Sequence, residues 1–472
     1  MPASAGQTRP GAVWALNGCR ACVELARTPR SEASRQASGH GQVRSDYNAH
    51  HWRFLTYGEG EMRKSWISIA ILGLLTAAAP AAEVDFAKAG MDKARLERIK
   101  PRMQQFADDK YVAGTVTLVM RRGELVHLEA AGWQDIEAKK PMRTDSIFQI
   151  MSMTKPVTGV AVMMMVEEGR LRLADPVEKH LPEFRGQLMI ESKDGDRVTL
   201  KKPSRPITIR DLMTHTSGMA GGPGPGIAEL LMRMDRSLAE AVAIYAQAPL
   251  SFEPGTKWQY SNTGIATLGR LVEVASGMPF EKFLDERIFK PLGMVDSHIF
   301  LPKEKRSRLA PVYDVKNGKL FKAGAELLAG DPMNYREGAK YSGPEYALYT
   351  TAPDLAKFYQ MMLNGGKLGQ SRILSPVSVE IMSKVHTGQI RAGWLKGTGF
   401  GLTWEVVSEP MGTLSGMAEG CFNHGGAFGT FGWVDPKREM VGVFMVQHDV
   451  STFDARDAFI GMANTAIIDV GR

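Results

Sequence analysis

Strand-like segments lie near both ends of this chain, and a long region of helical pattern separates them. Residues 115–120 and 124–128 are rich in β-branched and apolar residues, and Arg122-Gly123 between them suits the turn of a β-hairpin. Strands at both ends with helices inserted between them are typical of one antiparallel sheet assembled from distant segments. The later strand patterns lie at 399–407, 430–434 and 440–447.

Helical patterns flank and interrupt these strands. Residues 91–109 carry apolar residues at helical spacing, and residues 453–470 close the chain as an amphipathic helix. Residues 152–301 are mostly helical in pattern, broken by loops such as the Gly- and Pro-rich stretch at 221–226. We therefore expect an α/β (α+β) fold in which a central antiparallel sheet, flanked by helices, is interrupted by a mostly helical lobe. Residues 83–472 would form this single two-lobed domain.

A targeting signal is predicted ahead of the domain. Residues 62–64 read Met-Arg-Lys, residues 66–75 are apolar, and residues 79–82 end in Ala-Pro-Ala-Ala. A positive start, an apolar core of about ten residues and an A-x-A site are the parts of a secretory signal peptide. The core is shorter than the roughly 20 residues of a membrane span. We expect residues 62–82 to be removed near Ala81-Ala82, leaving a periplasmic or secreted protein without a stable membrane span.

The position of that signal affects how the first 61 residues are interpreted. A signal peptide begins a protein, so we hypothesise that Met62 is the true start and that residues 1–61 are a spurious or disordered extension. The alternative is a disordered cytoplasmic tail before a signal anchor. Cys19 and Cys22 lie in this extension without a second pair for zinc. Cys421 alone would remain, so no intramolecular disulfide is expected.

Charge and motif content exclude several classes of function. The net charge is +7, but residues 1–64 hold nine Lys and Arg against five Asp and Glu, so about +3 belongs to the rest of the chain. No basic stripe with interleaved aromatic residues supports a nucleic-acid surface. The histidines are scattered and H-E-x-x-H is absent, so we expect no metal and no other cofactor. The G-x-S-x-G elbow of α/β-hydrolases is absent too.

Ser152 and Lys155 form an S-x-x-K pattern that could supply a nucleophile and its base. Three residues of spacing on a helix put both side chains on one face. A serine hydroxyl needs such a base to attack a substrate. The apolar run at 157–166 predicts a buried helix that starts at Ser152, with Pro156 in its first turn. Burial would favour the neutral form of Lys155, which a general base requires.

The S-x-x-K pattern alone carries little information, because a chain of this length contains about one by chance. A Ser helix cap followed by an exposed Lys would be the simpler interpretation. Two further motifs favour the catalytic interpretation. They lie at residues 260–262 (Tyr-Ser-Asn) and 424–427 (His-Gly-Gly-Ala). Both suit ordinary turns. They would also provide a hydroxyl that moves a proton, an amide that binds substrate and glycines that let a substrate approach the backbone.

With these motifs on one chain, the sequence resembles the serine β-lactamase and penicillin-binding protein superfamily, in the class C-like branch that includes family VIII carboxylesterases. The resemblance runs in order from about Met91 to the C-terminal helix. Its matching stretches lie at 147–156, 175–177, 181–184, 207–219, 254–264, 291–294 and 424–435.

The resemblance implies a role for each matched residue. Ser152 would be the acylated nucleophile, Lys155 its base, and Tyr260 the second base and the acid that protonates the leaving group. Asn262 would bind substrate through its amide. The backbone N–H groups of Ser152 and Ala427 would form the oxyanion hole, where each such donor is worth about 3–4 kcal/mol in related chemistry.

Two stretches depart from the family pattern. β-Lactamases and peptidases carry Lys-Thr/Ser-Gly where this chain places its candidate substrate-binding residues His424, Gly425 and Gly426. A His is mostly neutral at pH 7 and Gly has no hydroxyl, so we expect weak recognition of β-lactams and of D-Ala-D-Ala termini. Uncharged esters suit this site better, as in the esterase branch. Residues 346–352 also differ from the Gly-Gly-Leu turn of relatives, and we expect His215 to belong to a structural loop.

These expectations lead to a serine hydrolase, with a carboxylesterase acting on small esters as the preferred function. The alternatives are a D-alanyl-D-alanine carboxypeptidase, a class C-like β-lactamase, or a non-catalytic receptor for penicillin or peptidoglycan fragments. The expected partner is a small-molecule ester or a peptidoglycan-like substrate, with no nucleic acid. The sequence does not predict an oligomeric state.

Overall fold

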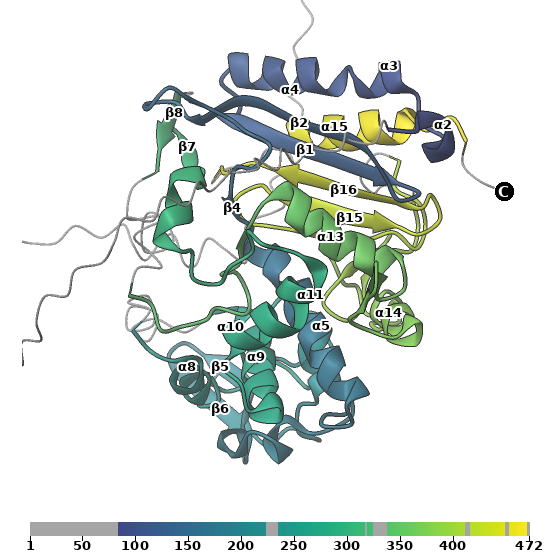
Figure 1. The fold of residues 1–472 in the computed structure, drawn as a ribbon. Helices are drawn as coiled ribbons and strands as arrows, with labels where there is room; N and C mark the ends of the chain where they lie inside the picture. The colour runs from purple at the N-terminus through teal and green to yellow at the C-terminus, as the bar shows by residue number, and fades with distance from the viewer. Residues whose placement is uncertain are drawn as a thin grey trace, which may run out of the picture. The chain divides into compact units, whose positions relative to one another are not determined.

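In the computed structural model, the two ends of the chain meet in one sheet, because β1 (Gly114–Arg121) pairs antiparallel with β16 (Met440–Met445). Among the described residues the sheet has eight strands, in the order β12-β13-β14-β15-β16-β1-β2-β3 (Figure 1). The expected central antiparallel sheet is thereby confirmed. Its other strands are β2 (Glu124–Asp135), β3 (Lys140–Pro141), β12 (Thr398–Phe400), β13 (Glu405–Val407), β14 (Phe422–Gly425) and β15 (Phe431–Asp435).

The structure describes most of the chain from Val84 onward. The predicted extension at 1–61 and signal peptide at 62–82 lie outside the described residues, as does most of the loop at 221–226. The residues described are 84–222, 235–316, 319–323, 338–410, 416–448 and 453–469.

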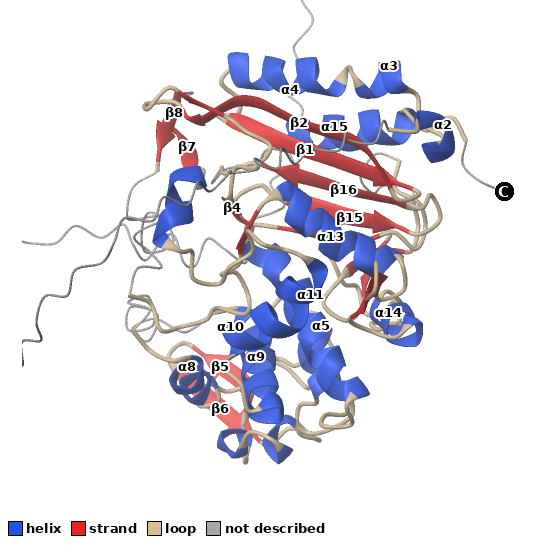
Figure 2. Ribbon diagram, viewed as in Figure 1, coloured by secondary structure: helices blue, strands red, loops and turns tan. Residues whose placement is uncertain are grey.

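Helices cover both faces of the sheet, as Figure 2 shows. Alternation along β1 divides its side chains between two cores, with Val116 and Leu118 in one and Val119 in the other. On the Val119 side, α4 (Ile99–Asp108) and α15 (Phe453–Thr465) pack on the strands. On the other side, α13 (Ala352–Leu363) packs on β1, β15 and β16. Two short helices, α2 (Phe86–Ala89) and α3 (Lys93–Leu96), precede α4.

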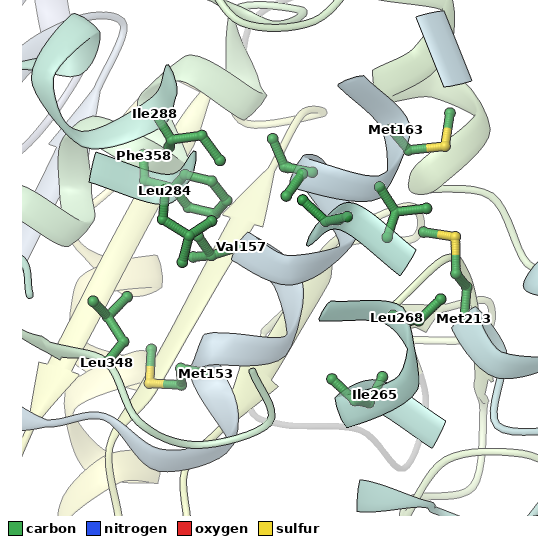
Figure 3. Close-up of a cluster of buried hydrophobic side chains, with 14 of the residues drawn as sticks. Met153, Val157, Met163, Met213, Ile265, Leu268, Leu284, Ile288, Leu348 and Phe358 are labelled. Atoms are coloured by element: carbon green, nitrogen blue, oxygen red, sulfur yellow. The ribbon is translucent and has the colours of Figure 1, made fainter. Parts of the chain in front are cut away.

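A mostly helical lobe is inserted between β3 and β12 in the sequence, as expected. Its central helix, α5 (Thr154–Glu167), is buried along most of its length and packs against α9 (Asn262–Ser276). Figure 3 shows Met153 and Val157 among the side chains of this core. The other helices of this region are α6 (Ile209–Met213), α8 (Leu238–Tyr245), α10 (Phe280–Leu284), the π-helix η4 (Asp285–Phe289), α11 (Lys290–Leu292) and α14 (Pro376–Met382).

Short elements complete the described structure. Four two-stranded sheets and several 3₁₀ turns lie in the connections between the larger elements. The strand pairs are β4 (Phe148–Gln149) with β9 (Tyr349–Thr350), β5 (Met189–Asp194) with β6 (Arg197–Lys201), β7 (Tyr313–Lys316) with β8 (Lys319–Lys322), and β10 (Lys367–Leu368) with β11 (Ser371–Arg372). The 3₁₀ turns are η1 (Met151–Met153), η2 (Val177–Lys179), η3 (Pro182–Phe184) and η5 (Lys303–Arg308).

Two elements differ from their sequence-based expectations. The helix predicted at 91–109 is two helices, α3 and α4, separated by Glu97 and Arg98, and Met91 stays outside α3 because it forms a β-bridge with Ile467. The strand predicted at 399–407 is split into β12 and β13. The turn between them places Thr403 at φ +67°, a backbone conformation that cannot continue a strand.

The pairing of β1 with β16 generates a stability prediction. Leu118 is 1% exposed and lies opposite Val443, so Leu118→Ala leaves a cavity in the core between the sheet and α13. We expect the free energy of unfolding to fall by about 2–5 kcal/mol, measured by chemical denaturation. The control Val295→Ala removes a side chain that is 69% exposed and should change it by no more than about 0.5 kcal/mol. Equal effects of the two substitutions would contradict the assigned core.

Candidate active site

Ser152 lies in the 3₁₀ turn η1, immediately before α5. The sequence predicted a helix starting at Ser152, but the helix starts at Thr154 because Met151 adopts φ +50°. Such a left-handed backbone costs about 1–3 kcal/mol for a residue other than Gly, so the surrounding contacts must stabilise it. The Thr154 hydroxyl donates to Met151 O (2.7 Å) and accepts from Leu348 N–H (3.1 Å). These bonds hold the turn that presents Ser152.

Lys155 and Tyr260 lie beside Ser152. Lys155 is fully buried, and its Nζ is 2.9 Å from Ser152 Oγ. The same Nζ donates to the backbone carbonyl of Glu345 at 2.7 Å. The ring centroid of Tyr260 is 4.8 Å from Nζ. The structure therefore brings the three predicted catalytic residues together, and the Glu345 carbonyl is a partner that the sequence did not reveal.

His215 supports the segment that carries Tyr260. Its backbone has φ +58°, its Nδ1 accepts from Ser261 N–H at 3.1 Å, and its ring centroid lies 4.4 Å from that of Tyr260. Burial, followed by the nearby Lys155, holds the His215 pKa well below its usual value, so its ring is neutral. Asn262 follows as the first residue of α9, where its backbone N–H donates to Gly221 O. His215 thus has a structural contact, as the sequence analysis expected.

His424 lies on β14 with its ring near those of Tyr260 and Trp394, at centroid distances of 6.2 and 6.0 Å. It is 1% exposed, and burial, followed by the charge of Lys155, lowers its pKa to about 3. His424 Nδ1 is 2.7 Å from Gly425 O, and a carbonyl oxygen only accepts, so Nδ1 carries the proton. The ring is therefore neutral at pH 7, and its Nε2 is a hydrogen-bond acceptor.

The loop after β14 lies against the nucleophile turn. A Cβ on Gly426 would overlap Ile150 O and Thr430 Oγ1, and the Thr430 hydroxyl donates to that same Ile150 O at 3.2 Å. Only Gly permits this approach. Ser152 is the second residue of η1, where backbone N–H groups precede the first intrahelical acceptor, and Ala427 follows Gly426 in the loop after β14. The two predicted oxyanion donors therefore lie on adjoining segments.

Aromatic side chains that were not predicted as site residues lie near Tyr260. Trp258 and Phe400 contact each other's rings at 5.6 Å, and Trp394 lies 5.7 Å from Trp258 and 5.1 Å from Tyr260. Trp258 lies in the same segment as Tyr260, so its proximity followed from the sequence. Trp394 and Phe400 are more than 130 positions away, and only the fold brings them here.

The described ranges hold neither a candidate metal site nor a candidate membrane span. There, no cluster of three or more His, Cys, Asp or Glu side chains is placed to hold a metal ion. No helix among those residues is long and apolar enough to cross a membrane.

Comparison with known proteins gives consistent matches. The Beta-lactamase family model matches residues 99–467. An uncharacterized protein of Mycobacterium tuberculosis (strain CDC 1551 / Oshkosh) is 32% identical over 384 residues, which cover 77% of this chain and 93% of that protein. Esterase EstB of Burkholderia gladioli is 31% identical over 376 residues, covering 75% and 91%. The structure of EstCE1, a hydrolase with promiscuous acyltransferase activity, shows the same fold, with a TM-score of 0.66 at 23% identity. The match covers 82% of this chain and 100% of the EstCE1 chain.

The neutral His424 predicts a pH effect on stability. Its folded pKa of about 3 lies below the unfolded value near 6.5, so the unfolded chain binds more protons between these pH values and stability falls as pH falls below 6.5. We expect His424→Gln to reduce this slope by up to about 1.4 kcal/mol per pH unit, measured by denaturation from pH 6.5 to 4.5. Identical slopes in both proteins would show that His424 is not buried in its neutral form.

Proposed function

Because the chain belongs to the beta-lactamase family of serine hydrolases, we propose that it is a carboxylesterase that hydrolyses small uncharged esters through an acyl-enzyme on Ser152. The observation that carries this proposal is His424, a neutral acceptor at the position where β-lactamases and peptidases of the family carry a Lys. The similarity to Esterase EstB supports the same class of substrate.

In the proposed first step, Ser152 Oγ attacks the ester carbonyl and its proton passes to the neutral amine of Lys155, 2.9 Å away. The carbonyl oxygen becomes an oxyanion, which the N–H groups of Ser152 and Ala427 stabilise. As the intermediate collapses, the bond to the alcohol oxygen breaks, and Tyr260 supplies the proton that this oxygen takes up. The products are a free alcohol and Ser152 esterified by the acyl group.

In the second step, a water molecule attacks the acyl-enzyme. Tyr260, left deprotonated by the first step, accepts the water's proton, and the same oxyanion donors stabilise the intermediate. The bond to Ser152 Oγ then breaks, and the ammonium of Lys155 returns its proton to Oγ. The carboxylic acid leaves, and Ser152 regains its proton. The buried Nζ of Lys155 keeps its bond to Glu345 O throughout, which fixes its position between the two steps.

The charge at the site separates the proposed function from its alternatives. Carboxypeptidase and β-lactamase substrates carry a carboxylate, which the family binds with the permanent charge of a Lys. His424 offers a lone pair at Nε2, which repels a carboxylate instead of binding it. An uncharged ester has no carboxylate, so its binding does not depend on a cation at position 424.

The proposed nucleophile is tested with a fluorophosphonate probe and a panel of p-nitrophenyl esters. We expect Ser152→Ala to abolish labelling and to lower kcat at least about 1,000-fold. Tyr260→Phe should lower kcat about 100- to 10,000-fold, as expected for loss of an acid–base group. The matched control Ser192→Ala changes an exposed Ser on β5 and should retain labelling and activity.

Three results would contradict the proposal in different ways. Labelling that persists in Ser152→Ala would show that Ser152 is not the nucleophile. Turnover of a chromogenic β-lactam well above that of p-nitrophenyl esters would replace the esterase with a β-lactamase. A folded wild-type protein that is not labelled but binds muropeptides would favour a receptor.

His424→Lys tests the argument from charge. A Lys at this position supplies a cation to a substrate carboxylate, so we expect the ratio of kcat/KM for a chromogenic β-lactam to that for p-nitrophenyl acetate to rise about tenfold or more. The control His424→Gln introduces no charge and should not raise the ratio. A ratio that is unchanged in His424→Lys would show that charge at position 424 does not select the substrate.

A further inference from the structure

Trp394 is the most exposed aromatic ring next to the proposed catalytic residues. It lies on the loop between α14 and β12 and is 46% exposed, although its ring lies 5.1 Å from Tyr260 and 6.0 Å from His424. Isolated exposed apolar side chains are common on protein surfaces and carry little meaning. The position of this one, between solvent and two residues of the site, is what distinguishes it.

The loop that carries Trp394 is anchored by a buried carboxylate. Glu405 on β13 is 5% exposed, and its Oε1 accepts from Trp394 N–H (3.0 Å) and from the Thr398 hydroxyl (2.8 Å). Burying a carboxylate is costly unless hydrogen bonds stabilise it, so these bonds constrain the loop strongly. Gly393 adopts φ +81°, and a Cβ there would lie 2.7 Å from the same Oε1. The backbone at Trp394 is therefore held at a defined place.

The anchor belongs to the same part of the sheet as the site. Glu405 pairs in register with Asn423, the residue that precedes His424 on β14. Neighbouring strands of one sheet keep a nearly constant spacing, so Glu405 sets the distance from Trp394 to His424. The loop thus extends the wall of the site rather than covering an unrelated surface.

We propose that Trp394 is a substrate-binding residue that packs against an apolar or aromatic group of the ester, and that Glu405 is the residue that positions it. The inference rests on the proposed esterase function and adds to it the substrate class, an ester with a sizeable hydrophobic group. An indole face buries a large apolar area at a small cost in conformational entropy, which makes it suited to such a group.

The test compares two series of esters on the full chain. One series is p-nitrophenyl esters with acetyl to octanoyl groups, and the other is acetate esters of methyl, butyl and benzyl alcohol. We expect Trp394→Ala to lower, by about tenfold, the ratio of kcat/KM for the largest ester to that for the smallest in at least one series. Trp394→Phe keeps an aromatic face and should retain most of the wild-type ratio. If the Ala variant does not fold, Trp394→Gln makes the same comparison.

A matched control is Trp133→Ala. Trp133 is 39% exposed, close to the exposure of Trp394, but it lies on β2, which three strands separate from β14. This variant should keep the wild-type ratios in both series. Ratios that stay at the wild-type value in Trp394→Ala, or that fall equally in Trp133→Ala, would overturn the proposal. Fluorophosphonate labelling of Ser152 distinguishes failure of the Trp394 proposal from failure of the esterase proposal. A Trp394→Ala protein that is labelled but keeps the wild-type ratios refutes the role of Trp394 and does not contradict the esterase function.

The positioning role of Glu405 has its own readout. Glu405→Ala removes the acceptor for Trp394 N–H, so we expect KM for the largest ester to rise several-fold more than KM for the smallest, with kcat less affected. Glu405→Gln keeps an oxygen acceptor and should restore the wild-type selectivity. A role limited to stability would lower activity toward all esters equally and leave the ratio of the two KM values unchanged, which would overturn the assignment of Glu405.

Discussion

The arrangement of the whole site depends on one close contact between the sheet and the helical lobe. The loop after β14 reaches the nucleophile turn at Ile150 O, which accepts from the Thr430 hydroxyl and leaves no room for a side chain on Gly426. On one side of this contact are Ser152 and α5, and on the other are His424 and Ala427. A shift here would move Ser152 relative to Ala427, whose backbone N–H is the second proposed oxyanion donor. In related chemistry, displacements of about 1 Å cost large factors in rate.

Burial around Lys155 explains the electrostatic character of the site. Burial depresses the pKa of both His215 and His424, and Lys155 lowers the pKa of each ring further whenever its amine is protonated. Both imidazoles are therefore neutral hydrogen-bonding or packing groups rather than cations. His215 uses its ring to hold the segment before α9, and the Nδ1 of His424 donates to Gly425 O. The proposed preference for uncharged esters rests on this neutrality, because a carboxylate would find no cation at position 424.

Much of the fold followed from local patterns. The hairpin of β1 and β2 was predictable because Gly123 between two strand patterns favours the positive φ that a tight hairpin turn requires, and Gly123 adopts it. The antiparallel sheet followed from strand patterns at both ends of the chain. The errors lie where tertiary contacts override local preference: Thr403 turns the chain inside a predicted strand, and Met151 delays the start of α5. Neither residue has a local signal for a left-handed backbone, since Thr and Met rarely adopt it.

The sequence by itself determined which residues could do the chemistry. A nucleophile, its base and its proton donor need particular side chains, so motif spacing and family resemblance identify the candidates. These are Ser152, Lys155, Tyr260, Asn262 and the His424–Ala427 stretch. The tertiary structure alone decided what those side chains experience. Depth of burial, the tautomer of His424 and the position of Trp394 beside Tyr260 arise from segments far apart in the chain, and sequence spacing carries no information about such distances.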